Sequence, residues 1–156
     1  MTSLAIRQAT TALDIAHARK LFEEYAAWLR IDLCFQNFDQ ELATLPGAYV
    51  PPRGRLLIAG PEGEPYGCIA LRPFDDVSGE VKRLYVRPAA RGHRAGEALV
   101  RTLLDDARAI GYRELKLDTF EWMNDARKLY ERLGFAYCSP YYHNPLPGAV
   151  YMSLAL

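Results

Sequence analysis

The chain has 156 residues, of which 50% are hydrophobic and 24% charged, and its 19 basic and 19 acidic residues cancel. A chain of this length buries most of its apolar surface without disulfides or metals, so we expect a single domain over residues 1–156. A nucleic-acid-binding protein would carry a basic excess, and no apolar run approaches the roughly 20 residues of a membrane span. The start of the chain lacks a signal-peptide core. These features predict a cytoplasmic protein that binds neither nucleic acid nor a membrane.

The three cysteines, Cys34, Cys68 and Cys138, are widely spaced and form no Cys-x-x-Cys pair. Their odd number predicts reduced, mostly buried thiols rather than a disulfide framework. A nucleophilic thiol would need an activating partner, and no histidine stands at a suggestive spacing. We therefore expect neither a metal site nor a catalytic cysteine.

The N-terminal half predicts a short strand, two helices, a loop and the two strands of a hairpin, in that order. Apolar residues at helical spacing define the first helix, and β-branched and aliphatic residues define the strands. Asp39 is a candidate N-cap for the second helix. The six segments are Leu4–Gln8, Ala12–Arg30, Phe38–Leu45, Pro46–Pro52, Arg55–Gly60 and Tyr66–Arg72.

The middle of the chain predicts a strand, a basic glycine-containing turn and a long helix. The strand is Gly79–Val86, Pro88 ends it because proline has no N–H for a ladder, and the helix Ala95–Ile110 stops at Gly111. Such a turn leaves the first N–H groups of the helix unpaired under the positive end of its macrodipole. Two glycines leave room for a phosphate, and three side chains add donors: Gly92, Gly96, Arg91, His93 and Arg94. The turn therefore suits a pyrophosphate.

The C-terminal third predicts one strand, one helix and two further strands, namely Leu115–Thr119, Met123–Leu133 with Gly134 as its cap, Phe135–Cys138 and Ala149–Ala155. The complete order is β-α-α-β-β-β-α-β-α-β-β. An alternation of this kind predicts a mixed α/β fold.

Two segments in this order carry a family resemblance. The pattern Val86-x-Pro88-x-x-Arg91-Gly92-x-x-x-Gly96-x-x-Leu99 resembles motif A of the GNAT N-acetyltransferase superfamily. The later run Ala126-Arg-Lys-Leu-Tyr130, followed by Gly134-Phe135, resembles its motif B. The resemblance covers Gly79 to Tyr137 and implies a transferase fold, a mixed, mostly antiparallel sheet flanked by helices and splayed between its fourth and fifth strands. It implies acetyl-CoA as co-substrate and an amine as acceptor.

The sequence departs from the two motifs at one position each. The central glycine of the usual phosphate turn is Arg94, whose N–H can still bind phosphate and whose guanidinium adds a possible contact. The asparagine that often precedes the motif B tyrosine is Met123, with Asn124 one position late. One helical residue is about 100° of rotation, so the asparagine's role is not transferred to Asn124.

The resemblance also implies roles for individual residues. Tyr130 would protonate the departing thiolate, and strand N–H groups would bind the pantetheine and polarise the thioester. The cofactor would contact Leu84, Tyr85, Val86, Arg91, Gly92, His93, Arg94, Ala95, Gly96 and Tyr130. Tyr130 could alternatively be an ordinary core residue on the same stripe as Ala126 and Leu133.

The general base is less defined by the sequence. Glu80 stands where some relatives carry a carboxylate that deprotonates the amine through water, but a solvated glutamate at a strand end is an equal alternative. Asp118 and His143 are rivals, the latter because its ordinary pKa suits proton transfer near neutral pH.

The acceptor site is expected between the first two helices and the last hairpin. Aromatic faces with a few acids or amides suit a small amine or an amino-acid-like acceptor, although aromatic loops also simply pack. The residues at these places include Trp28, Asp32, Phe35, Gln36, Phe38, Tyr49 and Tyr141–Asn144, and we single out Trp28, Phe35, Tyr142 and His143.

The sequence therefore predicts transfer of an acetyl group from acetyl-CoA to the primary amine of a small molecule or an amino-acid-like acceptor, by direct attack on the thioester. Three alternatives stay open: a catalytically inactive acyl-CoA-binding module, a protein or peptide N-acetyltransferase, and a domain that binds another phosphate compound. A homodimer is also compatible with the sequence.

Overall fold

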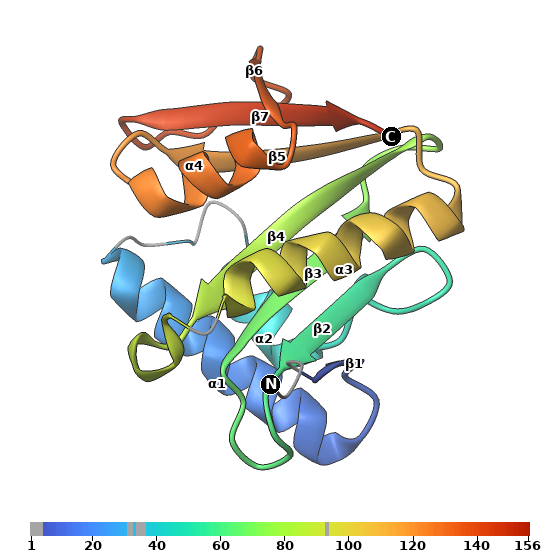
Figure 1. Ribbon diagram of the computed structural model, residues 1–156, viewed down its shortest axis with the longest axis vertical. Helices are drawn as coiled ribbons and strands as arrows, with labels where there is room; N and C mark the ends of the chain where they lie inside the picture. Colours follow the sequence, from blue (N-terminus) through green and yellow to red (C-terminus); the bar gives the residue numbers. More distant parts are fainter. Residues whose placement is uncertain (1–4, 31–32, 34–36, 93) are drawn as a thin grey trace.

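The computed structural model describes residues 5–30, 33, 37–92 and 94–156 of the chain. Within this part, seven strands form one sheet in the order β1-β2-β3-β4-β5-β7-β6, flanked by helices (Figure 1). None of the described helices has the length and apolarity of a membrane span. The order of elements and the mixed α/β fold predicted from the sequence are confirmed.

The described elements lie within a few residues of the predicted bounds. They are β1 (Ile6–Gln8), α1 (Ala12–Leu29), α2 (Phe38–Thr44), β2 (Arg55–Ala59), β3 (Gly67–Pro73), β4 (Ser78–Val86), the 3-10 turn η2 (Pro88–Ala90), α3 (Ala95–Ile110), β5 (Glu114–Phe120), α4 (Asn124–Arg132), β6 (Ala136–Cys138) and β7 (Ala149–Ala155).

The start of α2 differs from the prediction. The N-cap is Asn37, in the left-handed conformation with φ 55°, and it makes no side-chain cap hydrogen bond. Asp39 lies inside the first turn of the helix and does not cap it. Both residue types cap helices well, so the local sequence does not decide which of them does so.

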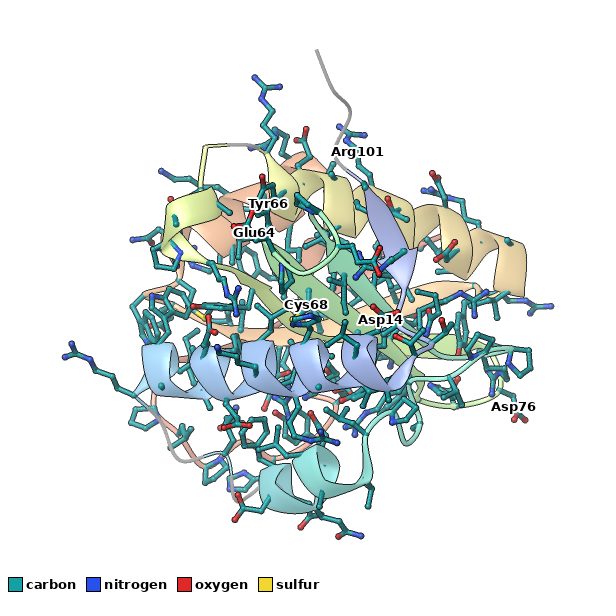
Figure 2. All side chains as sticks on the ribbon, turned by 90° about the horizontal axis from the view of Figure 1, so that it is seen from below. Asp14, Glu64, Tyr66, Cys68, Asp76 and Arg101 are labelled. Atoms are coloured by element: carbon teal, nitrogen blue, oxygen red, sulfur yellow. The ribbon has the colours of Figure 1, made fainter. Side chains whose placement is uncertain are left out.

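Alternation along the strands builds a separate core on each face of the sheet. Leu56 and Ile58 of β2 pack with α1 and α2, whereas Leu57 and Ala59 pack with α3 and α4. Figure 2 shows α1 and α2 on one side of the sheet and α3 on the other, with Cys68 between the sheet and α1. Successive strand residues point to opposite faces, so each strand supplies both cores.

The sheet parts between β4 and β5. These two strands are the parallel pair of the described sheet, and they pair only at Ser78–Glu80 with Glu114–Lys116. Beyond this point β4 runs to Val86 and β5 to Phe120 without pairing with each other. The two strands therefore diverge into a V (Figure 1).

A bulge in β4 lies just beyond the fork. Cys68 pairs with Tyr85 while Ala70 pairs with Lys82, so β4 carries one extra residue. Arg83 lies in this bulge with a φ of 61°, which is uncommon for a residue with a side chain. Bulges bend a strand and re-aim its side chains. This one helps to turn β4 away from β5.

We predict that Gly79→Ala destabilises the junction of β3, β4 and β5. A Cβ at Gly79 would lie 2.9 Å from Leu71 Cδ1, 3.0 Å from Leu115 Cδ2 and 3.1 Å from Tyr112 Cε2, all of them in the core. Overpacking of this kind costs about 1–3 kcal/mol, which urea denaturation would measure. In the control Gly96→Ala, the added Cβ has ordinary contacts of 3.6 and 3.8 Å and should cause no loss. Equal stability of both variants would contradict the prediction.

Candidate active site

The turn between β4 and α3 has the backbone of an anion site. Gly92 has a φ of 97° and Arg94, the N-cap of α3, has a φ of 56° without a side-chain cap. The first intrahelical bond in this turn runs from Ala98 N to Arg94 O, so the N–H groups of Ala95, Gly96 and Glu97 lack intrahelical partners. Arg94 thus adopts a left-handed conformation typical of the glycine it replaces.

Arg91 and Trp28 lie together beside this turn. The exposed Arg91 guanidinium stands 5.3 Å from the Trp28 ring centre, and its Nε donates to Val86 O at 3.3 Å. Trp28 also contacts Tyr85 and Trp122, with ring centres 6.2 and 6.0 Å apart. Trp28, which we expected at the acceptor, therefore lies next to the turn before α3.

The gap between the parted strands forms a narrow cleft. Tyr130 of α4 lies buried in its wall, opposite β4. Burial raises the pKa of Tyr130, and nearby Tyr25 and Asp118 raise it further. The cleft is lined by Tyr25, Leu29, Leu33, Val81, Lys82, Arg83, Leu84, Asp118, Thr119, Phe120, Met123, Ala126 and Tyr130.

The residue that departs from motif B, Met123, and its neighbour Asn124 also have defined places in the structure. Met123 is buried in the wall of the cleft, where its sulfur accepts a hydrogen bond from Thr119 Oγ1 at 3.3 Å. Asn124 is exposed, and its Oδ1 accepts from Arg127 Nη2 at 2.6 Å. Asn124 is engaged at the surface and does not line the cleft.

A buried ion-pair cluster lies at the fork of the V. Lys82 Nζ is 3.8 Å from Glu80 Oε2 and 3.6 Å from Asp118 Oδ1, and the side chains are 3%, 4% and 8% exposed. Continuing the β4–β5 register by two residues would place Lys82 opposite Asp118. Burial lowers the pKa of Lys82, while the two carboxylates oppose the shift. This ion pair spans the strands at the point where they part.

Glu80 is not a solvated residue at a strand end. Its Oε1 accepts a hydrogen bond from Arg72 Nε at 2.8 Å and its Oε2 accepts one from Tyr141 OH at 2.8 Å. Arg72 stands opposite Glu80 in the pairing of β3 with β4. The carboxylate is therefore held by two donors in addition to Lys82.

Asp118 is held from the loop between β6 and β7. Its Oδ2 accepts a short hydrogen bond from Tyr142 OH and one of 3.3 Å from Asn144 Nδ2. Burial raises the pKa of Tyr142, and Asp118 raises it further. His143, on the same loop, is exposed and lines a different pocket. The structure brings Glu80, Asp118 and Tyr142 into one cluster but leaves His143 outside it.

A pocket of about 510 Å³ opens on the other side of this cluster. It is lined by Asn37, Ala48, Arg72, Pro73, Phe74, Glu80, Lys82, Tyr141 and Tyr142. Lys82 lines both this pocket and the cleft, so the two cavities meet at its side chain. The described residues include no cluster of three or more His, Cys, Asp or Glu side chains able to hold a metal ion.

Two central residues, Lys82 and Arg72, were not among the predicted site residues. The sequence could have indicated Lys82, because it stands two residues after Glu80 on the same strand. Side chains at positions i and i+2 lie on the same face of a strand. Arg72 becomes a site residue only through the register of β3 with β4. Of the predicted residues, Phe35 and His93 lie outside the described part of the chain.

Comparison with known proteins identifies close relatives. A model of the acetyltransferase (GNAT) family matches residues 13–135. An uncharacterised N-acetyltransferase of Schizosaccharomyces pombe is 39% identical over 99% of this chain and 96% of its own. The structure of a putative acyl-CoA N-acyltransferase from Klebsiella pneumoniae is 31% identical, covers 100% of this chain and 98% of its own, and has a TM-score of 0.72. A putative acetyltransferase from Salmonella typhimurium, solved with its cofactor acetyl-CoA, shares the fold with a TM-score of 0.69, 20% identity and coverage of 99% and 94%.

We predict that Lys82→Met lowers the free energy of unfolding by about 3–5 kcal/mol, because it leaves two carboxylates buried without their shared cation. The double variant Lys82→Met/Asp118→Asn should recover part of this loss, since it removes one of the uncompensated charges. Urea denaturation measures both values.

The control for this prediction is Lys20→Met on the exposed side of α1, which should change stability by no more than about 0.5 kcal/mol. A double variant that is less stable than Lys82→Met alone would show that charge balance does not hold the fork together.

Proposed function

The chain is an acyltransferase of the acetyltransferase (GNAT) family, and from this premise we propose that it transfers an acetyl group from acetyl-CoA to the primary amine of a small molecule. The observation that carries the proposal is the meeting of two cavities at Lys82. A cleft suited to the thioester arm reaches this side chain from the side of α4, and a pocket for an acceptor reaches it from the side of α2. The amine and the thioester would react there.

The turn before α3 supports the choice of coenzyme A. Its free N–H groups, the left-handed Gly92 and the exposed Arg91 suit a pyrophosphate. A pocket of about 660 Å³ beside the turn is lined by Arg94, Glu97, Asp125, Lys128, Leu129 and Arg132. The cations of this pocket suit the further phosphate of coenzyme A. The related Salmonella structure contains acetyl-CoA.

We assign to Tyr130 the role of general acid, which protonates the leaving thiolate. Tyr130 lies in the cleft wall, and a phenol is protonated at neutral pH, so it has a proton to give. In the reaction the amine nitrogen attacks the thioester carbon, the new C–N bond forms and the C–S bond breaks. The Tyr130 hydroxyl gives its proton to the departing sulfur. The backbone N–H groups of β4 beyond the bulge would polarise the thioester carbonyl.

We assign to Glu80 the role of general base, which takes a proton from the acceptor amine. The acceptor ammonium must lose a proton before or during attack, and Glu80 lines the acceptor pocket with Tyr141 hydrogen-bonded to it. The proton would reach the carboxylate through a water or through the Tyr141 hydroxyl. Asp118 is the second candidate, because it faces Lys82 from the cleft side.

The direct test of the proposal is thiol release. With acetyl-CoA and a panel of small primary amines, free CoA should appear faster than through hydrolysis alone. A protein that binds acetyl-CoA tightly but releases no CoA with any small amine, peptide or protein acceptor would instead be an acyl-CoA-binding module. Release with peptides alone would assign it to the peptide N-acetyltransferases.

We predict that Arg91→Glu weakens acetyl-CoA binding by about 30- to 1,000-fold, because it removes a charge-assisted phosphate contact and adds repulsion. Calorimetric titration measures the change. Arg108→Glu provides a matched control, because it makes the same charge change on an exposed position in the last turn of α3. Similar weakening in both variants would indicate a general charge effect rather than a contact at the turn.

We predict that Tyr130→Phe lowers kcat by about 100-fold or more, the range expected for loss of a general acid. The ring remains, so its contact with Phe135 at 5.5 Å between ring centres is retained, and Tm and acetyl-CoA affinity should change little. A loss of affinity with kcat intact would mean that the hydroxyl only binds the sulfur in the ground state. A wild-type rate would make Tyr130 a core residue.

A further inference from the structure

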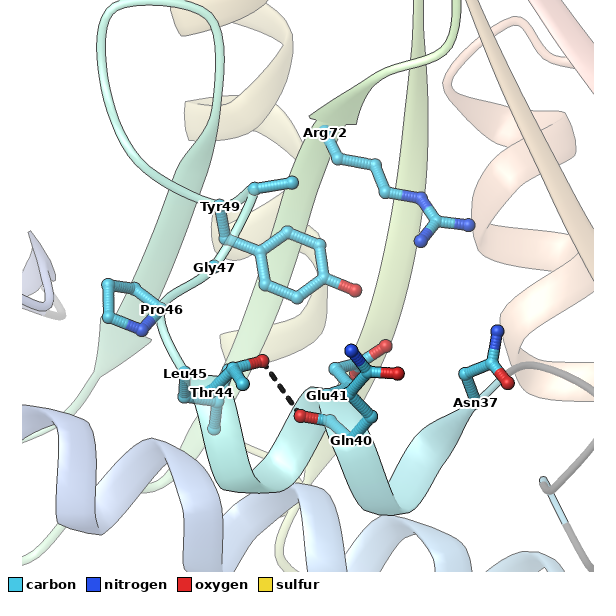
Figure 3. A pocket seen from close by; sticks show the side chains of 10 residues that line it. Asn37, Gln40, Glu41, Thr44, Leu45, Pro46, Gly47, Tyr49 and Arg72 are labelled. Carbon is cyan, nitrogen blue, oxygen red and sulfur yellow. Dashed lines mark hydrogen bonds between the residues drawn. The ribbon is translucent and has the colours of Figure 1, made fainter.

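A second pocket, of about 250 Å³, adjoins the acceptor pocket over α2 (Figure 3). Asn37, Ala48 and Arg72 line both pockets, so a molecule in one can extend into the other. The remaining lining comes from α2 and the loop that follows it: Gln40, Glu41, Thr44, Leu45, Pro46, Gly47 and Tyr49. Neither the proposed transfer chemistry nor the cofactor uses this pocket.

Arg72 has unpaired N–H donors where the two pockets adjoin. Its Nε donates to Glu80 Oε1 at 2.8 Å, and its two terminal nitrogens have no partner among the described residues. The side chain is 37% exposed, so a ligand can reach it. Figure 3 shows the guanidinium turned towards the space above α2. A guanidinium presents its remaining N–H groups in a fork that fits a carboxylate.

Tyr49 supplies a second donor. Its hydroxyl is buried and has no hydrogen-bond partner among the described residues, and the ring points into the pocket between Arg72 and Glu41 (Figure 3). A buried hydroxyl without a partner is costly to the folded protein. Burial raises the pKa of Tyr49, and Glu41 raises it further, so the hydroxyl remains a donor.

The carboxylates around this pocket, Glu41 and Glu80, are already ion-paired with arginines. Glu41 accepts hydrogen bonds from Arg83 Nε at 2.9 Å and from Arg83 Nη2 at 3.0 Å. Glu80 is paired with Arg72 and lies near Lys82. Arg72 and Tyr49 therefore leave donors unpaired where the two pockets adjoin, and a ligand that carries an acceptor can pair with them.

We propose that this pocket binds the carboxylate of the acceptor, through Arg72 and Tyr49, and that the acceptor is a free amino acid. The inference rests on the proposed acetyl transfer, which requires an amine in the neighbouring pocket near Glu80 and Lys82. One small molecule then carries both groups, with the amine at the fork and the carboxylate over α2. Phe74, Tyr141 and Tyr142 give the neighbouring pocket apolar faces for the side chain.

The charges favour a carboxylate over a phosphate. Arg72 already shares its charge with Glu80, and Glu41 is paired with Arg83. A dianion would bring two negative charges to Arg72, the one cation among the described residues that line the small pocket, whereas a carboxylate brings only one. The acceptor must also be short, because Arg72 lies on β3, directly beside β4, and adjacent strands are about 4.8 Å apart. An amino acid has both properties: a single negative charge on its carboxylate and a short distance from that carboxylate to its amine.

The test compares each common amino acid with its own α-amide as acceptor for the wild-type protein and acetyl-CoA. The amide keeps the side chain and the amine but has no negative charge. Its amine is also less basic and more of it is unprotonated, so basicity cannot explain a preference for the acid. For the preferred amino acid we expect kcat/KM about 30-fold or more above that of its amide, the effect of one charge-assisted bidentate contact.

Two variants test whether Arg72 and Tyr49 cause the preference for the acid, and a third variant is a control. Arg72→Gln should bring the acid-to-amide ratio close to unity. Tyr49→Phe should lower the ratio by about 3- to 10-fold without lowering Tm, because the hydroxyl it removes has no partner in the free protein. Tyr112→Phe is the matched control: its hydroxyl donates to Arg53 O at 2.7 Å, away from both pockets, so Tm should fall and the ratio should stay unchanged.

The outcomes separate this inference from the proposed function. Acetylation of amines with no preference for the acids, or with a preference that Arg72→Gln leaves intact, would overturn the inference and keep the transferase. Calorimetric binding of an amino acid in the presence of CoA, lost in Arg72→Gln but without any acetyl transfer, would keep the inference and overturn the proposed reaction. Neither binding nor acetylation of any amino acid would overturn the inference.

Discussion

The parting of β4 from β5 is the constraint on which the rest of the molecule depends. Three residue pairs join the strands, and the ion pair of Lys82 with Asp118 occupies the next position in register. The extra residue at Arg83 then bends β4. A sheet that continued to pair would have no cleft, and α4 would have no gap to face. Each feature assigned to catalysis therefore lies at or beyond this fork.

Opening a sheet exposes backbone and places charges in the interior, and the molecule balances those charges in pairs. Lys82 faces two carboxylates, Arg83 makes a bidentate pair with Glu41, and Arg72 binds Glu80. Buried ion pairs often contribute little net stability against apolar substitutes. In the proposed reaction their position matters more than their stability, because they would hold Glu80 and Asp118 at fixed points beside the acceptor amine.

The local part of this arrangement could be predicted from the sequence, and the long-range part could not. The strand, turn and helix around Gly92 follow from Pro88, helical periodicity and the stop at Gly111, which are signals within one segment. The pocket joins Arg72 of β3, Glu80 of β4 and a loop after α2, and this convergence depends on strand register. The contact of Trp28 with Arg91 could not be predicted for a related reason, because the sequence does not say which residues the end of α1 meets.

The two halves of the site are built from parts that can vary independently. The cleft is lined by residues of α1, β4, β5 and α4, whereas the wall of the neighbouring pocket includes Tyr141 and Tyr142 from the loop after β6. Loops between elements tolerate substitution better than the elements themselves. If the proposed function holds, a change after α2 would alter the acceptor site, whereas a change at Tyr142 would also reach Asp118 in the cleft. Lys82 lines both cavities, so in the proposed function a substitution there would affect acceptor binding and the reaction together.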